Sequence, residues 1–222
     1  YWFFGRGDDA SPVETIIEAP PERILPPPAL PESEPESVPI PTLNESDAFV
    51  RNLVAALSAH PRFASWVTSD GIIRRFVVII DNIADGTNPA QHMTFMRPES
   101  RFTTTADGAT LRINARNYNR YDRHAQIISS LNTQGSANLY LMMQPLIQEA
   151  YVELGNPDRP FISALERAII NLLNVPIVED PAVVEYSPFF HYTDERLESL
   201  SLSQKQFLGM GPDHIRIGQA LA

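Results

Sequence analysis

The densest group of chemically capable side chains lies between Tyr118 and His124, where the sequence runs Tyr-Asn-Arg-Tyr-Asp-Arg-His. A phenol, a carboxylate and an imidazole at this spacing could transfer protons, and the intervening arginines could bind an anion. In a helix, Tyr121 would share a face with His124, and Tyr118 would share a face with Asp122. The alternative is structural: a polar helix begins here, its tyrosines pack on the core, and Asp122 pairs with a nearby arginine. The structural interpretation is preferred.

Two adjacent arginines, Arg74 and Arg75, interrupt the apolar sequence around them. One of the two must point toward the packed side of its helix or lie at the edge of that side. A half-buried guanidinium needs a carboxylate partner, because an unpaired charge is costly away from water. Glu149 and Glu153 are the expected partners. The preferred role is therefore structural, and an anion site is the alternative.

A candidate contact region is the aromatic sequence Phe189-Phe190-His191-Tyr192. These side chains either pack in the core or form an exposed patch that contacts another protein. Core packing is the simpler explanation, but no other segment is a better candidate for a partner surface. Residues 93–96, Met-Thr-Phe-Met, rank next because they lie in a loop long enough to bind.

Motifs of known chemistry are missing from the sequence. There is no nucleophile elbow, no zinc-protease helix, no phosphate loop and no dinucleotide fingerprint. The absence of cysteine removes disulfides, thiolate catalysis and the common structural zinc sites. The five histidines are far apart and have no ligand spacing. The sequence predicts no catalytic residue, no metal and no cofactor.

The charge of the chain limits the partners it could have. The 222 residues carry a net charge of −10, and 43% of them are hydrophobic. A general nucleic-acid binder needs clustered lysine and arginine to neutralise phosphates, and docking on anionic lipid needs the same. We therefore expect no nucleic-acid partner, and we expect enough apolar sequence for one domain with a full core.

The candidate residues need elements to position them, and the apolar spacing predicts mostly helices. A first helix begins at Asn44 or Ser46, with inward residues Phe49, Leu53, Ala56 and Leu57. A second helix between Asp70 and Gly86 is apolar almost all round and should be central. Further helices are expected within residues 114–132, 133–154 and 161–174.

The later part of the chain mixes helices with extended segments. Residues 102–113 predict a hairpin with Asp107-Gly108 in its turn, and residues 181–192 are extended. Thr193 and Ser203 are expected to begin short helices. The inward faces are expected to be Leu139, Met142, Met143, Leu146, Ile147, Ala150 and Leu154, followed by Leu165, Ile169, Leu172 and Leu173.

The chain before Leu43 has a different composition from the rest. Half of the 20 prolines lie there, and eight acidic residues face two arginines, so residues 5–42 predict a disordered, extended spacer. The aromatic residues 1–4 look like the interfacial end of a transmembrane helix that precedes this chain. Residues 43–222 are expected to be the folded domain.

Several of these segments together resemble one bacterial family, the domain-of-unknown-function family numbered three thousand and fourteen. The resemblance covers residues 40 to 215, and its motifs are Leu43–Arg51, Ile73–Phe76, Asp81–Ala84, Tyr118–Asp122, Pro145–Gly155, Gln204-Lys205 and Met210-Gly211-Pro212. The resemblance implies a protein of Gram-negative bacteria with one membrane helix, a proline-rich spacer and a helical domain. It implies no activity and no catalytic residues.

The sequence thus predicts a mainly α protein: a single helical domain with a small β-hairpin and a short extended segment, preceded by a disordered proline-rich tail. The expected role is a non-enzymatic interaction or scaffold module, tethered to the bacterial inner membrane by one span and facing the periplasm. Its partner would be an envelope protein or a second copy of itself. One alternative is an envelope enzyme in which Tyr121, Asp122, His124 and Arg74 or Arg75 meet in one cleft. Another is a small-ligand sensor with an apolar cavity beside Pro145.

Overall fold

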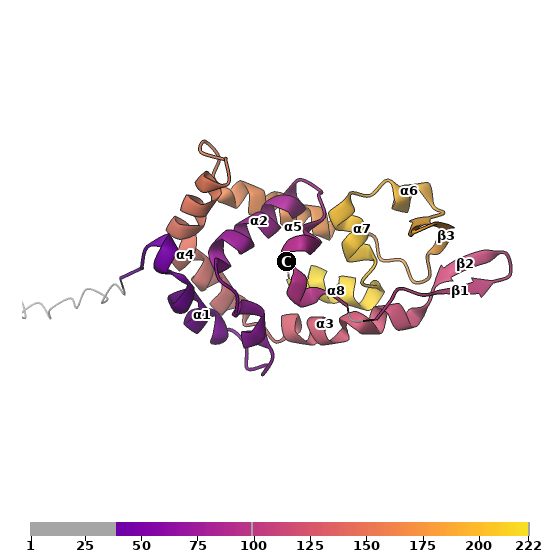
Figure 1. Ribbon diagram of the computed structural model, residues 1–222, viewed down its shortest axis with the longest axis horizontal. Coiled ribbons are helices and arrows are strands. Elements are labelled where there is room, and N and C mark those ends of the chain that lie inside the picture. Colours follow the sequence, from indigo (N-terminus) through magenta and orange to yellow (C-terminus); the bar gives the residue numbers. More distant parts are fainter. Residues whose placement is uncertain (1–38, 99, 222) are drawn as a thin grey trace, which may run out of the picture. The chain divides into compact units, whose positions relative to one another are not determined.

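The computed structural model describes residues 39–98 and 100–221, and the compact unit to which they belong begins at Ile40. The predicted anchor end (residues 1–4) and nearly all of the predicted disordered spacer lie outside the described residues. The described residues form eight α-helices: α1 (Asp47–Ala55), α2 (Ile72–Ala84), α3 (Asp122–Ser129), α4 (Thr133–Glu153), α5 (Phe161–Leu173), α6 (Glu195–Glu198), α7 (Leu202–Leu208) and α8 (Pro212–Leu221). The prediction of a mainly α domain with minor β structure is confirmed (Figure 1).

Shorter elements connect these helices. The four strands are β1 (Thr104–Asp107), β2 (Thr110–Ile113), β3 (Ala182–Tyr186) and β4 (Phe189–Tyr192). The short 3₁₀-helices are η1 (Leu43–Glu45), η2 (Phe63–Val67), η3 (Pro89–His92), η4 (Thr94–Met96) and η5 (Ala115–Tyr121). The η2 and η4 turns and the η5–α3 junction carry most of the polar residues discussed below.

Helix α2 is central, as its continuous apolar sequence predicts. It packs against α1, α4, α5 and η3 (Figure 1). Val77 in the middle of the helix is fully buried, and Ile73 and Ile83 are almost so. A helix surrounded on several sides cannot place polar residues on those sides without losing their hydration, which explains the long apolar run.

The first turn of α2 is capped from another helix. The Asp47 carboxylate, at the start of α1, accepts hydrogen bonds from the N–H groups of Gly71 and Ile72 at 2.7 and 3.0 Å. Gly71 has a φ of +68°, a conformation that glycine adopts without strain. Ser46, which was expected to cap α1, instead donates its hydroxyl hydrogen to the carbonyl of Leu43 at 2.8 Å. The carboxylate therefore ties α1 to α2. Ser46 occupies the N-cap position of α1, as predicted, but its side chain makes no capping hydrogen bond.

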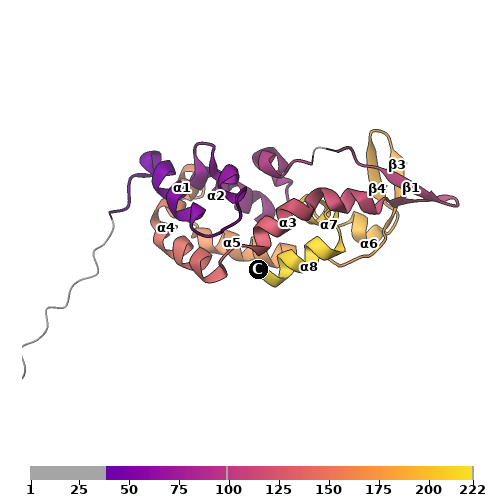
Figure 2. The same cartoon turned by 90° about the horizontal axis from the view of Figure 1, so that it is seen from below.

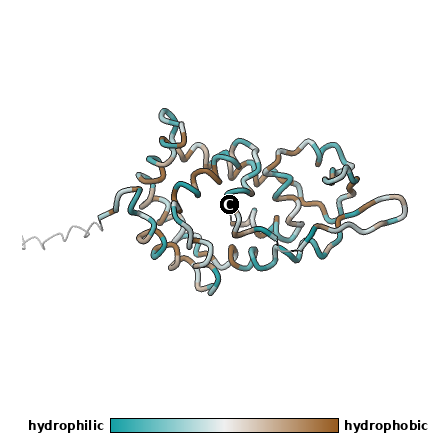
Figure 3. The backbone as a smooth tube through the Cα atoms, in the orientation of Figure 1, coloured by the Kyte–Doolittle hydropathy of each residue, from teal (hydrophilic) through white to brown (hydrophobic). Residues whose placement is uncertain are grey.

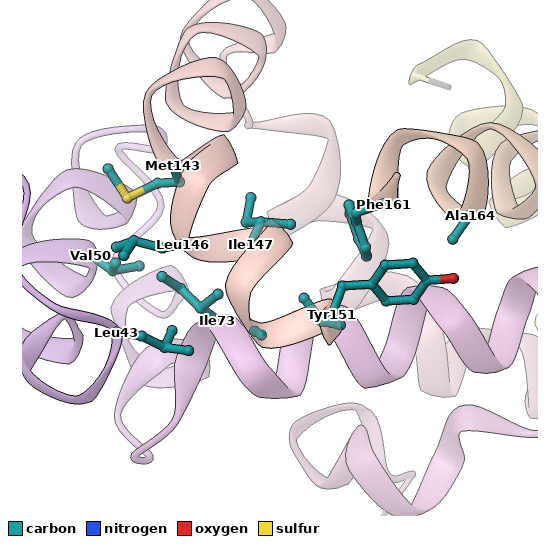
Figure 4. Close-up of a cluster of buried hydrophobic side chains, with 11 residues drawn as sticks. Leu43, Val50, Ile73, Met143, Leu146, Ile147, Tyr151, Phe161 and Ala164 are labelled. Carbon is teal, nitrogen blue, oxygen red and sulfur yellow. The ribbon is translucent and has the colours of Figure 1, made fainter. Parts of the chain in front are cut away.

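The main hydrophobic core lies between α1, α2, α4 and α5 (Figure 4). Tyr151 and Phe161 meet edge to face there, with ring centroids 5.4 Å apart. Apolar and polar residues alternate along the helices, as Figure 3 shows. The buried members of this core are Leu43, Val50, Ile73, Val77, Met143, Leu146, Ile147, Ala150, Tyr151, Phe161 and Ala164.

Two predicted helix faces are partly wrong. In α1 the deepest residue is Val50, whereas Ala56 is exposed. In α4 the predicted inward residue Met142 is 43% exposed, and Tyr151 is buried instead. Neighbouring residues are about 100° apart around a helix, so a spacing rule places the buried stripe only to within one position.

Helix α5 shows the same error with a clearer cause. Its buried face is built on Ala164 and Ala168, whereas the predicted inward residue Leu173 is 44% exposed. Small side chains allow α5 to approach α2 closely, and this close contact places the bulkier leucines at the edges of the interface. Hydrophobicity alone therefore selected the wrong centre for this face.

The four strands form one antiparallel sheet in the order β1-β2-β3-β4. The predicted hairpin is confirmed as β1 and β2, but its turn is Gly108-Ala109, one residue later than predicted, and Gly108 has a φ of +59°. The segment predicted only as extended is a second hairpin, β3 and β4. The pairing of Leu111 with Val183 joins the two hairpins. The sheet lies at the end of the domain opposite α1 and α4 (Figures 1 and 2).

The short C-terminal helices begin at residues other than those predicted. Asp194, not Thr193, caps α6 by accepting a hydrogen bond from the N–H of Arg196 at 2.9 Å. Ser201, not Ser203, caps α7 through a reciprocal capping box with Gln204. Serine and threonine occur at several neighbouring positions here, so residue type alone did not identify the cap.

Candidate functional site

The predicted site residues lie in three separate parts of the domain. Arg74 and Arg75 are on α2, and Tyr121, Asp122 and His124 are at the η5–α3 junction. Phe189, Phe190, His191 and Tyr192 form strand β4. Each group has its own surroundings, which decide what it can do.

Arg74 is fully engaged in structural contacts. Its guanidinium donates to both carboxylate oxygens of Glu153 on α4, at 2.6 and 3.0 Å, and to the side-chain oxygen of Asn44 at 2.8 Å. This hydrogen bond lowers the pKa of the Glu153 carboxyl. The predicted pairing of this arginine with Glu153 is confirmed. Asn44, a predicted cap of α1, serves here as an acceptor instead.

Arg75 differs from its neighbour because, among the described residues, no carboxylate pairs with it. Its guanidinium donates to the hydroxyl of Ser69 and to the carbonyl of Asp70. The side chain borders an apolar cavity of about 330 Å³ between α1, η2, α2 and α4. We call this the apolar cavity; its lining includes Val54, Leu57, Phe63, Ile72, Phe76, Leu139 and Ile147, together with Trp66 and Phe95. Pro145, where a ligand-sensing cavity was expected, is exposed and does not line it.

Asp122 pairs with a histidine on α8, not with the predicted arginine. Its carboxylate lies 3.0 Å from Nε2 of His214, while Nδ1 of the same ring donates to the carbonyl of Met210 at 2.7 Å. Helices α3 and α8 lie side by side, and this contact joins them (Figure 2). Because each ring nitrogen faces an oxygen of the protein, neither is free to take a proton from a bound molecule.

Tyr121 contacts both histidines, with ring centroids 6.4 Å from His214 and 6.1 Å from His124. Tyr121 is buried, and its burial raises the pKa of the phenol. The His124 ring stacks on Trp66 with centroids 5.9 Å apart, and its Nε2 lies 3.3 Å from the carbonyl of Phe95. Its Nδ1 is buried and has no hydrogen-bond partner among the described residues. The three predicted acid–base residues are neighbours, but His124, Asp122 and Tyr121 each line a different cavity, so they do not meet in one cleft, and the two arginines of α2 lie elsewhere.

A second cavity lies on the His124 side of Trp66 and Phe95. It has a volume of about 470 Å³ and collects four arginines: Arg62, Arg97, Arg120 and Arg123. Ser65, Ser100, Asn119 and His124 add polar groups. No described carboxylate lines it. We call it the basic cavity.

Sequence reasoning found only half of the basic cavity. Arg120 and Arg123 belong to the Tyr118–His124 group, for which anion binding was one alternative. Arg62 precedes η2 and Arg97 follows η4, so single arginines more than 20 positions from that group complete the cavity. Only the fold brings them together. The one sequence feature that could have singled out Arg62 is that no acidic residue stands near it in the chain.

Strand β4 divides the predicted aromatic patch into two faces. Its register pairs Tyr186 with Phe189 and Val184 with His191, so these four side chains share the outer face of the sheet. Phe189 is 68% exposed and Tyr186 is 64% exposed. We call these four residues the hairpin face. An exposed apolar patch thus exists where the sequence suggested one.

Phe190 and Tyr192 lie on the opposite face of the same strand. The Phe190 ring contacts Phe102 with centroids 5.1 Å apart, and burial strongly raises the pKa of the Tyr192 phenol. Alternation along a strand explains this result, because successive side chains point to opposite faces. Core packing is correct for these two residues, and surface exposure is correct for Phe189.

The comparisons with known proteins give one match. The family model described as "Protein of unknown function (DUF3014)" matches residues 72–221. The chain belongs to this family. The DUF3014 match begins at α2 and includes Arg97, Arg120 and Arg123, whereas α1, η2 and Arg62 precede it. The resemblance seen in the sequence is confirmed.

No curated protein and no solved structure shows significant similarity to this DUF3014 chain. Among residues 39–98 and 100–221, no helix has both the length and the apolar character needed to cross a bilayer. The predicted anchor residues 1–4 are outside that range.

Proposed function

We propose that this DUF3014 domain is a non-enzymatic protein-interaction module of the bacterial cell envelope, and that the hairpin face is its contact surface. The observation that carries the proposal is the outward position of Phe189 and Tyr186 on a short hairpin. Exposed tyrosine and phenylalanine are enriched at protein interfaces, because they bury a large area for little loss of side-chain freedom.

The charge of the domain indicates the chemistry of the partner. Outside residues 1–42 the chain has 15 lysine and arginine residues (17 − 2) and 19 acidic residues (27 − 8), so the domain is acidic. Near the hairpin face, Arg112 is already paired with Asp107 and Asp180. We therefore propose a protein partner that offers an apolar side chain surrounded by basic residues.

The proposed location rests on the sequence alone. The aromatic residues 1–4 and the proline-rich residues 5–42 support a domain held in the periplasm by a single span of the inner membrane. A contact surface far from the tethered end of the domain would then face other envelope proteins. The alternative enzyme is less well supported, because Asp122 and His124 have different neighbours.

The test is site-specific photo-cross-linking in the cells that make the full chain. A photoreactive phenylalanine analogue at position 189 should give a discrete cross-linked protein. The same analogue at Leu141 is the matched control, because that residue is 63% exposed on α4. Tyr186→Ser, an exposed substitution, should remove the product at position 189 without lowering the melting temperature.

The captured protein must then bind the purified domain, and Phe189→Ser must weaken that binding. Equal capture at positions 189 and 141 would contradict the proposal, as would capture that survives Tyr186→Ser. Products that contain only this chain would replace the proposed partner with a second copy.

A further inference from the structure

The four arginines of the basic cavity share one feature, which is the lack of a carboxylate partner in the described part of the domain. Among the described residues, none of the four lies within 4.0 Å of a carboxylate oxygen. Elsewhere, cationic side chains are paired with Asp or Glu at seven positions: Arg51, Arg74, Arg112, Arg167, Arg196, Lys205 and Arg216. In an acidic domain, chance favours carboxylates near arginines. Eight described arginines have no such partner, and four of these eight line this one cavity.

The arginines come from three separate segments and converge on one space. Arg62 precedes η2, Arg97 follows η4, and Arg120 and Arg123 lie on either side of the η5–α3 junction. Like charges brought together repel one another, which costs free energy in the absence of an anion. No carboxylate among the described lining residues offsets this cost, and a bound anion would offset it.

Two features indicate a prepared site rather than a loose cluster. Arg120 is held in place, because its guanidinium donates to the carbonyl of Asn117 at 2.8 Å and to that of Ser100 at 3.2 Å. His124 in the cavity wall is 9% exposed, and its Nδ1 has no partner among the described residues. A buried polar atom without a partner is costly and rare in folded proteins.

We propose that the basic cavity binds the phosphate group of a small phosphorylated molecule. Guanidinium groups match phosphate oxygens in paired hydrogen bonds, and a tetrahedral anion accepts donors from several directions at once. A planar carboxylate would use fewer of the four arginines. The volume of about 470 Å³ is in the range of small-molecule sites and leaves room for a non-phosphate part against Trp66 and Phe95.

The same chemistry could come from a free metabolite or from the headgroup of a phospholipid. The first test uses pyrophosphate with the full chain in isothermal titration calorimetry at low and moderate salt. We expect saturable binding with a submillimolar Kd that weakens as salt is added. Pyrophosphate should also raise the melting temperature, because it binds only the folded protein. The second test measures sedimentation with vesicles that contain phosphatidylglycerol.

The informative variant is Arg97→Gln/Arg123→Gln. Both side chains are exposed and make no hydrogen bond among the described residues, so the fold should be unaffected. We expect at least a tenfold rise in Kd. The matched control is Arg101→Gln/Arg116→Gln, which removes the same charge from exposed positions outside the cavity and should change Kd less than twofold.

Solution binding with this pattern assigns the site to a soluble phosphorylated ligand. Vesicle binding alone, with the same dependence on the cavity variant, assigns it to a lipid headgroup. Equal weakening by the two double variants would show general attraction to the surface and would overturn the proposal. No binding to either probe would also overturn it. None of these outcomes depends on the hairpin face.

Discussion

Two cavities share the wall formed by Trp66 and Phe95, and their linings are opposite in character. The apolar cavity, of about 330 Å³, is lined by the facing sides of α1, α2 and α4, with Arg75 at its border. The basic cavity, of about 470 Å³, is lined by turns and helix ends that carry four arginines. The Trp66 and Phe95 rings that separate them have centroids 5.1 Å apart.

The difference shows what each side contributes. Residues on the apolar side exclude water from the main core, so their removal should cost folding free energy. Three of the four arginines on the basic side are exposed, and none of the four has a carboxylate partner among the described residues, so removal of the exposed ones should leave the fold intact and change binding. Substitutions on the two sides of one wall can therefore separate stability from recognition.

The largest effect is expected for Ile73→Asp on the apolar side. Ile73 is 4% exposed, lines the apolar cavity and belongs to the main core. A carboxylate there would lose its hydration and gain no partner, so we expect a loss of about 4 kcal/mol or more and an unfolded chain. Circular dichroism at increasing temperature measures this.

The matched control for that change is Leu141→Asp. Leu141 is 63% exposed on α4, so the same charge should change the free energy of unfolding by less than about 0.5 kcal/mol. If the Ile73→Asp protein is stable, Ile73 is not buried in the main core beside the apolar cavity.

The next effect is expected at the wall itself. Trp66→Ala removes a half-buried ring that contacts Phe63, Phe95 and His124. We expect a loss of about 2–3 kcal/mol, below the range for a fully buried tryptophan. Pyrophosphate binding should also weaken, because His124 loses the ring on which it stacks.

Trp66→Phe keeps an aromatic wall and serves as the control. It should recover most of the stability and most of the binding. Unchanged pyrophosphate binding in Trp66→Ala would show that the basic cavity does not depend on the Trp66 ring. The two sides of the wall would then differ only in their effect on stability.

The apolar side could be predicted from the sequence and the basic side could not. The sequence between Asp70 and Gly86 is apolar almost all round, and this local feature predicted that α2 is central. The basic cavity has no period. Arg62 and Arg97 are single residues in separate turns, and their meeting with Arg123 depends on how the chain packs over long distances.

The strands show the same limit in another form. The sequence identified the aromatic residues of β4 but not the pairing with β3. Without the register, alternation could not say that Phe189 faces outward and Phe190 inward. The histidine that binds Asp122 was likewise out of reach, because 92 positions separate the two residues.

A third prediction concerns Glu198, which lines neither cavity, and the loss of stability at acid pH. Hydrogen bonds from Lys205, and also from the N–H of Tyr192 and from His191, lower the pKa of Glu198 from its ordinary value near 4.5 to about 2. A carboxyl with a lowered pKa stabilises the fold above its unfolded pKa and loses that effect as the pH falls through the folded value.

We therefore expect Glu198→Gln to lower stability at neutral pH by roughly 1 kcal/mol, after allowance for solvent screening. The difference from the unchanged protein should shrink between about pH 4.5 and pH 2, which chemical denaturation at a series of pH values measures. A stability difference that stays constant across this pH window would show that the lowered pKa of Glu198 is not its cause. The same measurements give the stability of the fold at each pH. They therefore show whether weaker pyrophosphate binding at low pH is caused by unfolding.

The smallest effect is expected from the adjacent arginines of α2, which repeat the contrast between the cavities within one helix turn. Arg74 is paired with Glu153 at the surface, with 38% and 45% of the two side chains exposed. Arg74→Gln should lower the melting temperature by at most a few degrees, and added salt should reduce the difference. The pKa of Glu153, followed by NMR, should rise because the hydrogen bond that lowers it is gone.

Arg75→Gln should leave the pKa of Glu153 unchanged, because Arg75 contacts Ser69 and Asp70 rather than that carboxylate. It should also leave pyrophosphate binding unchanged, since Arg75 borders the apolar cavity on the other side of the wall. Weakened pyrophosphate binding in Arg75→Gln would mean that the two cavities act as one site. The wall of Trp66 and Phe95 would then be part of a single binding surface, with an apolar and a basic half.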